Sequence, residues 1–159
     1  DLKIPYAAVA TDIRTGRRVT IKEGRVARAV AGSSAFPGFF APADLAGGFL
    51  IDGGIAGNVP VETVREMGAE FIIASNVIPT KYMRTLPHDP FQAFGRSLDL
   101  VLKHLSREEM EKADVLVQLE MEEDIWQLDL NKAKKLIAGG EMAAHRVINR
   151  IRKSLRLRS

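Results

Sequence analysis

The sequence predicts an α/β protein in which a parallel or mixed sheet is covered by helices on both faces. Short apolar runs of strand length alternate along the chain with longer segments of helical periodicity. This alternation is typical of crossover connections, which place helices on the faces of a sheet. With 159 residues, 46% of them hydrophobic, the chain is long enough to bury a core of its own. We therefore expect a single domain over residues 1–159.

The N-terminal half is expected to hold three strands and two helices. Thr15-Gly16 is a turn signal between two strand-like runs, so the simplest interpretation of the first two strands is a hairpin. Pro60 suits the first turn of a helix, and Gly68 suits its end. The expected elements are strands at 4–10, 19–21 and 49–51 and helices at 25–34 and 60–67.

The C-terminal half continues the alternation. The apolar run at 70–77 predicts a buried strand, and apolar residues spaced by three or four predict a helix over 91–112. Gly139-Gly140 is expected to divide the last helical region into two helices. The remaining expected elements are an irregular segment at 78–90, a strand at 114–121 and helices at 130–138 and 141–155.

Composition excludes several kinds of function. The chain has no cysteine, which excludes disulfides, thiolate catalysis and Cys-ligated metals. A chain without cysteine is compatible with any redox compartment, and we expect the cytoplasm or a membrane surface. A net charge of +3 is too mild to indicate nucleic-acid binding on its own. No apolar stretch approaches the roughly 18 residues that span a bilayer. Because the chain begins with Asp1 rather than Met, we expect a fragment or a processed product.

Asp52-Gly53-Gly54 is the most informative motif, because it places a carboxylate between an apolar strand and a flexible turn. Ligands of α/β proteins collect at the carboxyl ends of strands, and glycine lets a backbone or substrate come close. The functional interpretation of Asp52 is a general base that accepts a proton from a serine hydroxyl. The alternative is a turn aspartate that accepts hydrogen bonds from neighbouring amides, which the spacing alone favours.

No serine of the chain has the sequence context of an activated nucleophile. A nucleophile elbow needs glycine two residues before and two residues after the serine. Ser34 has Gly32 before it but Phe36 after it, and Ser33 has alanine at both positions. We therefore expect that this chain contains no nucleophile.

Metal and nucleotide sites are not expected either. The histidines are far apart in the sequence and have neither the spacing of a metal site nor that of a catalytic triad. Gly139-Gly140 follows a helix rather than a strand, which is the wrong context for a nucleotide-binding loop. We expect no metal and no cofactor. The histidines are His88, His104 and His145.

The residue pattern of the C-terminal segment 141–159 predicts a basic amphipathic helix. Val147, Ile148, Ile151 and Leu155 lie on one helical face of this segment. Such a helix can lie on an anionic membrane surface, or its apolar face can pack on the core while its basic face is solvated. RNA binding is disfavoured, because no aromatic residue interleaves with the charges. The basic residues are Arg146, Arg150, Arg152, Lys153, Arg156 and Arg158.

Three linked motifs resemble the patatin-like phospholipase family. Residues 6–16 are similar to the strand and turn that follow the nucleophile in that family. Residues 31–42 are similar to the family's Ala-Ser-x-Ala-x-Pro-x-x-Phe-x-Pro segment. Residues 52–61 resemble its catalytic-aspartate motif and the Asn-x-Pro that follows. Gly68-Ala69-Glu70 continues the pattern, and the similarity covers roughly residues 4–77.

The resemblance implies a lipid acyl hydrolase of the phospholipase A or esterase type with a three-layer α/β/α fold and a Ser-Asp dyad. Asp52 would be the proton acceptor of the dyad, supported by Gly53, Gly54, Asn58 and Pro60, and the substrate a lipid or acyl ester. The family's oxyanion loop and Gly-x-Ser-x-Gly elbow lie N-terminal to the similar region, and this chain has neither. We therefore expect the C-terminal part of the domain, inactive alone, with activity in a longer parent or a complex with the missing half.

Two alternatives remain beside the hydrolase. A non-catalytic patatin-like module could bind a lipid surface or a partner protein through Phe36, Phe39, Phe40 and the basic helix at 141–159. The second alternative is a nucleotide-binding domain, but the chain lacks the glycine-rich phosphate-binding motif of such domains. If one edge of the sheet is open, association into homo-oligomers is expected.

Overall fold

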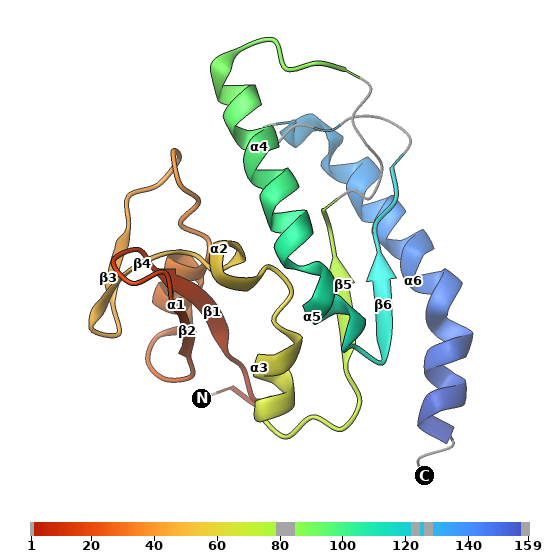
Figure 1. Cartoon of the computed structure of the whole chain (residues 1–159). Helices are drawn as coiled ribbons and strands as arrows, with labels where there is room; N and C mark the ends of the chain where they lie inside the picture. The colour runs from red at the N-terminus through yellow and green to blue at the C-terminus, as the bar shows by residue number, and fades with distance from the viewer. Residues whose placement is uncertain (1, 79–84, 122–124, 126–128, 157–159) are drawn as a thin grey trace.

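The computed structural model of the chain describes residues 2–78, 85–121, 125 and 129–156, whose strands form two sheets (Figure 1). Helices lie between and around these sheets, so the expected α/β class is confirmed. In chain order the elements are β1 (Ala8–Asp12), β2 (Arg18–Ile21), α1 (Val26–Ser33), β3 (Ala43–Leu45), β4 (Gly48–Asp52), α2 (Gly54–Gly57), α3 (Val61–Glu66), β5 (Ile73–Asn76), α4 (Pro90–Leu105), α5 (Arg107–Glu111), β6 (Val115–Gln118), the 3₁₀ helix η1 (Leu130–Lys132) and α6 (Ala133–Arg156).

The first sheet is antiparallel, with the strand order β2-β1-β4-β3. The expected hairpin is confirmed, because β1 pairs with β2 and Gly16 takes a φ of +69° in the turn, a conformation that glycine adopts without strain. The three-residue strand β3 is not apparent from the sequence. Helix α1 packs on this sheet and closes a core of Ala8, Ala10, Ile21, Ala29 and Leu50.

The second sheet is the parallel pair β5 and β6. Figure 1 shows α4 and α5 on one side of this pair and α6 on the other, so this half of the molecule has three layers. The expected helix at 91–112 is present as α4 and α5, which meet at Ser106. Asp89 caps α4 by accepting a hydrogen bond from the Gln92 amide at 2.8 Å. The core of this half is formed by Val59, Val61, Ile72 and Ala74.

The strands thus divide between two sheets, whereas the alternation of elements suggested one. Strands β1 and β4 each have a neighbour on both sides in the first sheet, while β5 pairs within the described residues with β6 alone. The expectation of a buried strand at 70–77 is therefore wrong for one face of β5. Ile73 is 49% exposed and Val77 66% exposed, while Ala74 and Asn76 are buried.

A largely buried ion pair joins the two halves. The Arg18 guanidinium on β2 donates to both carboxylate oxygens of Glu109 on α5, at 2.9 and 2.6 Å. Arg18 also donates to the carbonyl oxygen of Ala56 at 3.4 Å, and Glu109 accepts from the Glu62 amide at 3.3 Å. A side chain at Gly57 would occupy the position of the guanidinium, so glycine makes room for the pair. Two-pronged pairing of this kind fixes geometry as well as adding energy.

The expected break at Gly139-Gly140 is wrong, because α6 runs without interruption from Ala133 to Arg156. A Cβ on Gly139 would lie 3.0 Å from Leu119 Cδ1 and 2.9 Å from Met121 Sδ. This glycine therefore lets the helix approach the chain that follows β6. The cost of glycine to helix stability is outweighed by the tertiary contact. The first residues of the expected helix at 130–138 form η1 instead.

Substituting the two glycines of α6 separately should have opposite effects. Gly140→Ala should raise the free energy of unfolding by about 1 kcal/mol, because alanine is the better helix former and open space surrounds this position. Gly139→Val should lower it by about 1–3 kcal/mol through overpacking. Urea unfolding measures both, and equal effects of the two substitutions would contradict the packing role of Gly139.

Breaking the ion pair between the halves should be costly. Arg18→Met leaves Glu109 buried and without its partner, so we expect the free energy of unfolding to fall by about 3 kcal/mol. The double variant Arg18→Met/Glu109→Leu should recover much of this loss, because apolar side chains can replace a buried pair. As a control, Lys112→Met removes the exposed pair with Glu62 and should have a smaller effect. Equal losses in the two single variants would show that the pair at Arg18 has no special role.

Candidate functional site

Asp52 is the last residue of β4, a strand that lies inside the first sheet. Its backbone is fixed from two directions. The Asp52 amide donates to the carbonyl oxygen of Ala35 at 3.0 Å, and the Thr11 hydroxyl donates to the Asp52 carbonyl oxygen at 2.9 Å. Because Ala35 follows α1 and Thr11 belongs to β1, the position of the candidate carboxylate depends on three separate elements.

The Asp52 carboxylate is half-buried and has one oriented hydrogen bond. Its Oδ1 accepts from the Gly54 amide at 2.7 Å. Burial raises the pKa of this carboxyl above its usual value, and the hydrogen bond from Gly54 opposes the rise. In the described part of the chain, Asp52 takes part in no ion pair. A carboxylate with a raised pKa and no fixed cation is suited to accepting a proton.

Both glycines of the motif are required by space. A side chain on Gly53 would collide with the Val9 carbonyl, with its Cβ 2.7 Å from the Val9 carbonyl carbon. A Cβ on Gly54 would lie 2.9 Å from Asp52 Oδ1 and 3.1 Å from Asn58 Oδ1. The first glycine thus lets the chain pass close to β1, and the second leaves space beside the carboxylate.

The structure brings only some of the expected supporting residues to the carboxylate. The Asn58 side-chain oxygen lies beside the same side of Gly54 as Asp52 Oδ1. Pro60 instead precedes α3, which begins at Val61, one residue later than the first-turn position expected from the sequence. It is the residue that caps the start of this helix.

The two serines that precede Ala35 donate their hydroxyl groups to backbone carbonyls. Ser33 Oγ donates to the Val9 carbonyl at 2.6 Å, and Ser34 Oγ donates to the Val30 carbonyl at 2.8 Å. The Ser33 carbonyl accepts from the Gly53 amide at 3.2 Å, so the backbone of Ser33 borders the motif while its side chain does not serve it. Neither hydroxyl is placed to transfer its proton to Asp52.

The histidines also lie apart from the motif. His88 precedes α4, His104 is in the last turn of that helix, and His145 is on α6. All three are exposed. Within the described ranges, no group of three or more His, Asp or Glu side chains is arranged to hold a metal ion.

Thr11 is a site residue that sequence reasoning missed. It is 1% exposed, and its hydroxyl accepts from the Ala56 amide at 3.1 Å while donating to the Asp52 carbonyl. It thereby ties the start of α2 to the end of β4. A polar residue inside the apolar run that forms β1 was the available signal, because a buried hydroxyl needs partners.

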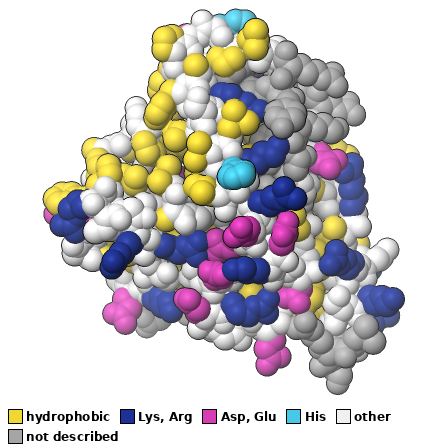
Figure 2. Space-filling model, in the orientation of Figure 1, with side chains coloured by type: hydrophobic (Ala, Val, Ile, Leu, Met, Phe, Trp, Pro, Cys, Tyr) yellow, Lys and Arg dark blue, Asp and Glu magenta, His cyan; other side chains and the backbone are white. Residues whose placement is uncertain are grey.

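An aromatic cluster borders the motif on the side of α4. Phe36 and Phe39 meet edge to face at 5.6 Å between ring centroids, and Phe39 meets Phe91 in the same way at 4.8 Å. Phe36 and Phe39 are thus partly used in packing, and of the three loop phenylalanines only Phe40, 65% exposed, is largely free for a partner. Figure 2 shows hydrophobic side chains gathered over this part of the surface. The exposed ones on α4 include Phe94.

A cavity of about 740 Å³ lies at the carboxyl ends of β5 and β6, and Asp52 does not line it. Its walls are mostly apolar. Asp99 of α4 reaches this cavity, while Leu102, three residues later on the same helix, lies beside Gly54. Helix α4 therefore contributes residues both to the cavity and to the surroundings of the Asp52 motif. The other lining residues include Val77, Leu119, Leu136 and Ala143.

The fold and this strand-end carboxylate define an α/β protein with a candidate acid–base site at the end of β4. The family model described as patatin-like phospholipase matches residues 3–65, which include the whole Asp52 motif. Residues 3–65 are therefore similar to the patatin-like phospholipase family, and the resemblance expected from the sequence is confirmed.

Individual relatives match a similar length of the chain. A Mycobacterium bovis protein named as an uncharacterized member of the NTE family is 40% identical over 73 residues, which are 46% of this chain and 20% of the relative. Patatin-like phospholipase domain-containing protein 7 of Rattus norvegicus is 35% identical over 79 residues, or 48% of this chain and 6% of that protein. Protein 6 of the same series from Homo sapiens is 37% identical over 79 residues, again covering 6% of the relative. The chain therefore spans a fifth or less of the length of these relatives.

Replacing the Asp52 carboxylate should stabilise the fold at neutral pH. Because burial raises the folded-state pKa of Asp52 above 3.8, the folded state binds more protons than the unfolded state in the interval between the two pKa values. The stability contributed by this group is present below the unfolded pKa and is lost as the pH rises through the folded pKa. Asp52→Asn should therefore raise Tm at pH about 7, with the advantage vanishing below pH about 4. Thermal unfolding followed by circular dichroism over this range measures the effect.

Asp12→Asn is the matched control with the opposite sign. The hydrogen bond from the Arg14 guanidinium and those from the Arg14 and Thr15 amides hold the pKa of Asp12 below its usual value. Its stabilising contribution is present above the unfolded pKa and is lost as the pH falls through the folded pKa. Asp12→Asn should lower Tm at neutral pH. A decrease in Tm for both Asp12→Asn and Asp52→Asn would refute the opposite pKa shifts of the two carboxyls.

Proposed function

We propose that this chain supplies the aspartate of a Ser-Asp dyad in a lipid acyl hydrolase of the phospholipase A or esterase type. One observation carries the proposal: Asp52 lies at the end of a strand within the family-matched residues, half-buried, with one carboxylate oxygen held by the Gly54 amide. The nucleophilic serine belongs to a part of the protein outside this sequence, because no serine here has the elbow context. Residues 1–159 then form the C-terminal portion of the domain.

The chemistry follows from the carboxylate. The serine oxygen attacks the ester carbonyl carbon while its proton passes to Asp52, and the tetrahedral intermediate collapses as the leaving alcohol takes that proton. Water then attacks the acyl-enzyme, Asp52 accepts the proton from water, and the serine regains it when the fatty acid leaves. Gly54 holds Oδ1, which leaves Oδ2 as the oxygen for these transfers. No histidine is needed, in agreement with the distant positions of His88, His104 and His145.

Two features support a substrate with an apolar chain. The relatives in rat and human carry phospholipase in their names, and the aromatic cluster of Phe36, Phe39 and Phe91 borders the candidate site. The site receives its backbone support from Ala35, the residue directly before this cluster. An acyl chain bound along α4 would therefore reach the region of Asp52.

The test compares variants of the parent protein that includes this chain. Asp52→Asn should lower kcat for release of fatty acid from phosphatidylcholine by about 10²–10⁴-fold, the usual contribution of a general acid–base group, with little change in KM. Asp44→Asn, a change of the same kind at an exposed residue of β3, should leave kcat unchanged. The isolated 159-residue chain should show no hydrolysis. Full activity of Asp52→Asn, or Asp52-dependent turnover by the isolated chain, would refute the proposal.

A non-catalytic lipid-binding module is the second candidate, and the apolar cavity beside β5 and β6 favours it. Its size and apolar walls suit an aliphatic chain. In this case a fluorescent fatty acid binds the 159-residue chain, and Ala143→Phe, which fills the cavity, abolishes binding while Asp52→Asn does not. Hydrolysis that depends on Asp52 in the parent would decide for the enzyme instead.

A further inference from the structure

The second half of α6 concentrates positive charge. From Met142 to Ser159 the sequence contains six Arg or Lys residues and no Asp or Glu. The buried residues of this helix are Gly139 and Ala143, both in its first half. Figure 1 shows its last turns extending beyond β6 at the margin of the molecule. The charge is therefore carried by the part of the helix that contributes least to the core.

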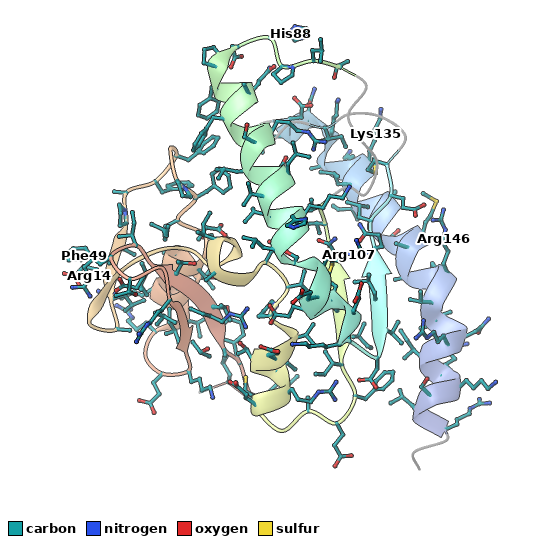
Figure 3. All side chains as sticks on the ribbon, viewed as in Figure 1. Arg14, Phe49, His88, Arg107, Lys135 and Arg146 are labelled. Carbon is teal, nitrogen blue, oxygen red and sulfur yellow. The ribbon has the colours of Figure 1, made fainter. Side chains whose placement is uncertain are left out.

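Two arginines tie the helix to the second sheet. Arg146, midway along α6 in Figure 3, pairs with Glu120 at 3.2 Å between Nη1 and Oε2. One turn later, Arg150 donates to the carbonyl oxygen of Asp114 at 3.0 Å. Both contacts are on the side of α6 that faces β6 and the residues next to it. They set the orientation of the rest of the helix.

The next cations form a separate surface, which we call the cationic face. Arg152, Lys153 and Arg156 surround a hollow of about 330 Å³ together with Asn149. Their spacing from Asn149 is three, four and seven residues, so all four lie on one face of the helix. All four are exposed.

An apolar strip runs beside the cationic face. Ile148, Ile151 and Leu155 are spaced by three and four residues, the first two are half-buried, and Leu155 is 48% exposed. A helix with cations on one side and partly exposed aliphatic residues next to them can lie in the headgroup region of a bilayer. Among the described residues, no helix combines the length and apolarity needed to cross a membrane, so α6 would lie along the surface.

We propose that the cationic face of α6 binds the surface of an anionic phospholipid bilayer, with Leu155 directed toward the acyl region. Charge complementarity carries this choice, because closely spaced Arg and Lys side chains attract anionic headgroups. Nucleic acid also carries phosphates, but residues 142–159 have no aromatic side chain on which bases could stack. The surface is independent of Asp52 and goes beyond the proposed catalytic role.

Sedimentation of the 159-residue chain with vesicles tests the proposal. The chain should bind vesicles of phosphatidylcholine mixed with phosphatidylserine and should not bind phosphatidylcholine alone. Added salt should weaken the binding, because the attraction is electrostatic. Equal binding to both vesicle types would overturn the proposal. So would failure to bind either type while a single-stranded RNA oligonucleotide is bound.

Charge variants locate the surface. Arg152→Gln/Lys153→Gln should reduce partitioning onto phosphatidylserine-containing vesicles by about thirtyfold, at about 1 kcal/mol for each basic residue near the surface. The control Arg17→Gln/Lys22→Gln removes the same charge from exposed positions directly before and after β2 and should have little effect. Equal losses would show attraction by net charge alone and would overturn the assignment to α6. Far-ultraviolet circular dichroism checks that both variants are folded, and Leu155→Ser, which keeps the charge, should also weaken binding.

Discussion

The pair between Arg18 and Glu109 is the constraint on which the arrangement of the molecule depends. Arg18 belongs to the antiparallel sheet and Glu109 to the helical layer of the parallel pair, so their two-pronged hydrogen bonds join halves with separate apolar cores. The guanidinium also contacts the Ala56 carbonyl, and the absent side chain of Gly57 gives it room. Because α2 follows the Asp52 motif directly, the interaction that joins the halves also fixes the segment that follows the candidate carboxylate.

Two aspartates, each the last residue of one of two neighbouring strands, have pKa values shifted in opposite directions by their surroundings. Asp12 ends β1 beside the Arg14 guanidinium and two backbone amides, which favour its charged form and lower its pKa. Asp52 ends β4 with one amide donor and, among the described residues, no ion pair, and burial raises its pKa. The first environment favours the charged carboxylate, while the second favours the protonated form, as the proposed role of Asp52 as a proton acceptor requires.

Much of the local structure and one side of the site were predictable from the sequence. Turn and helix-end signals depend only on neighbouring residues in the chain. Thr15-Gly16 therefore predicted the first hairpin, and Pro60 with Gly68 predicted the limits of α3 to within one residue. The Asp52 motif was recognisable because a carboxylate and two glycines are adjacent in the chain. The support from Thr11 and Ala35 was not, because these residues are 41 and 17 positions away. Thr11 meets Asp52 through the pairing of β1 with β4, and Ala35 meets it because α1 packs on that sheet.

The sequence by itself determined the α/β class, the similarity of residues 3–65 to the patatin-like phospholipase family and the basic character of the last helix. Only the tertiary structure decided how the strands divide between two sheets, since pairing depends on which edges meet in space. It also decided that Gly139 continues a helix, because a close contact with Leu119 and Met121 outweighs an intrinsic preference of about 1 kcal/mol. Propensity acts through neighbours in the chain, whereas packing acts between residues that folding alone brings together.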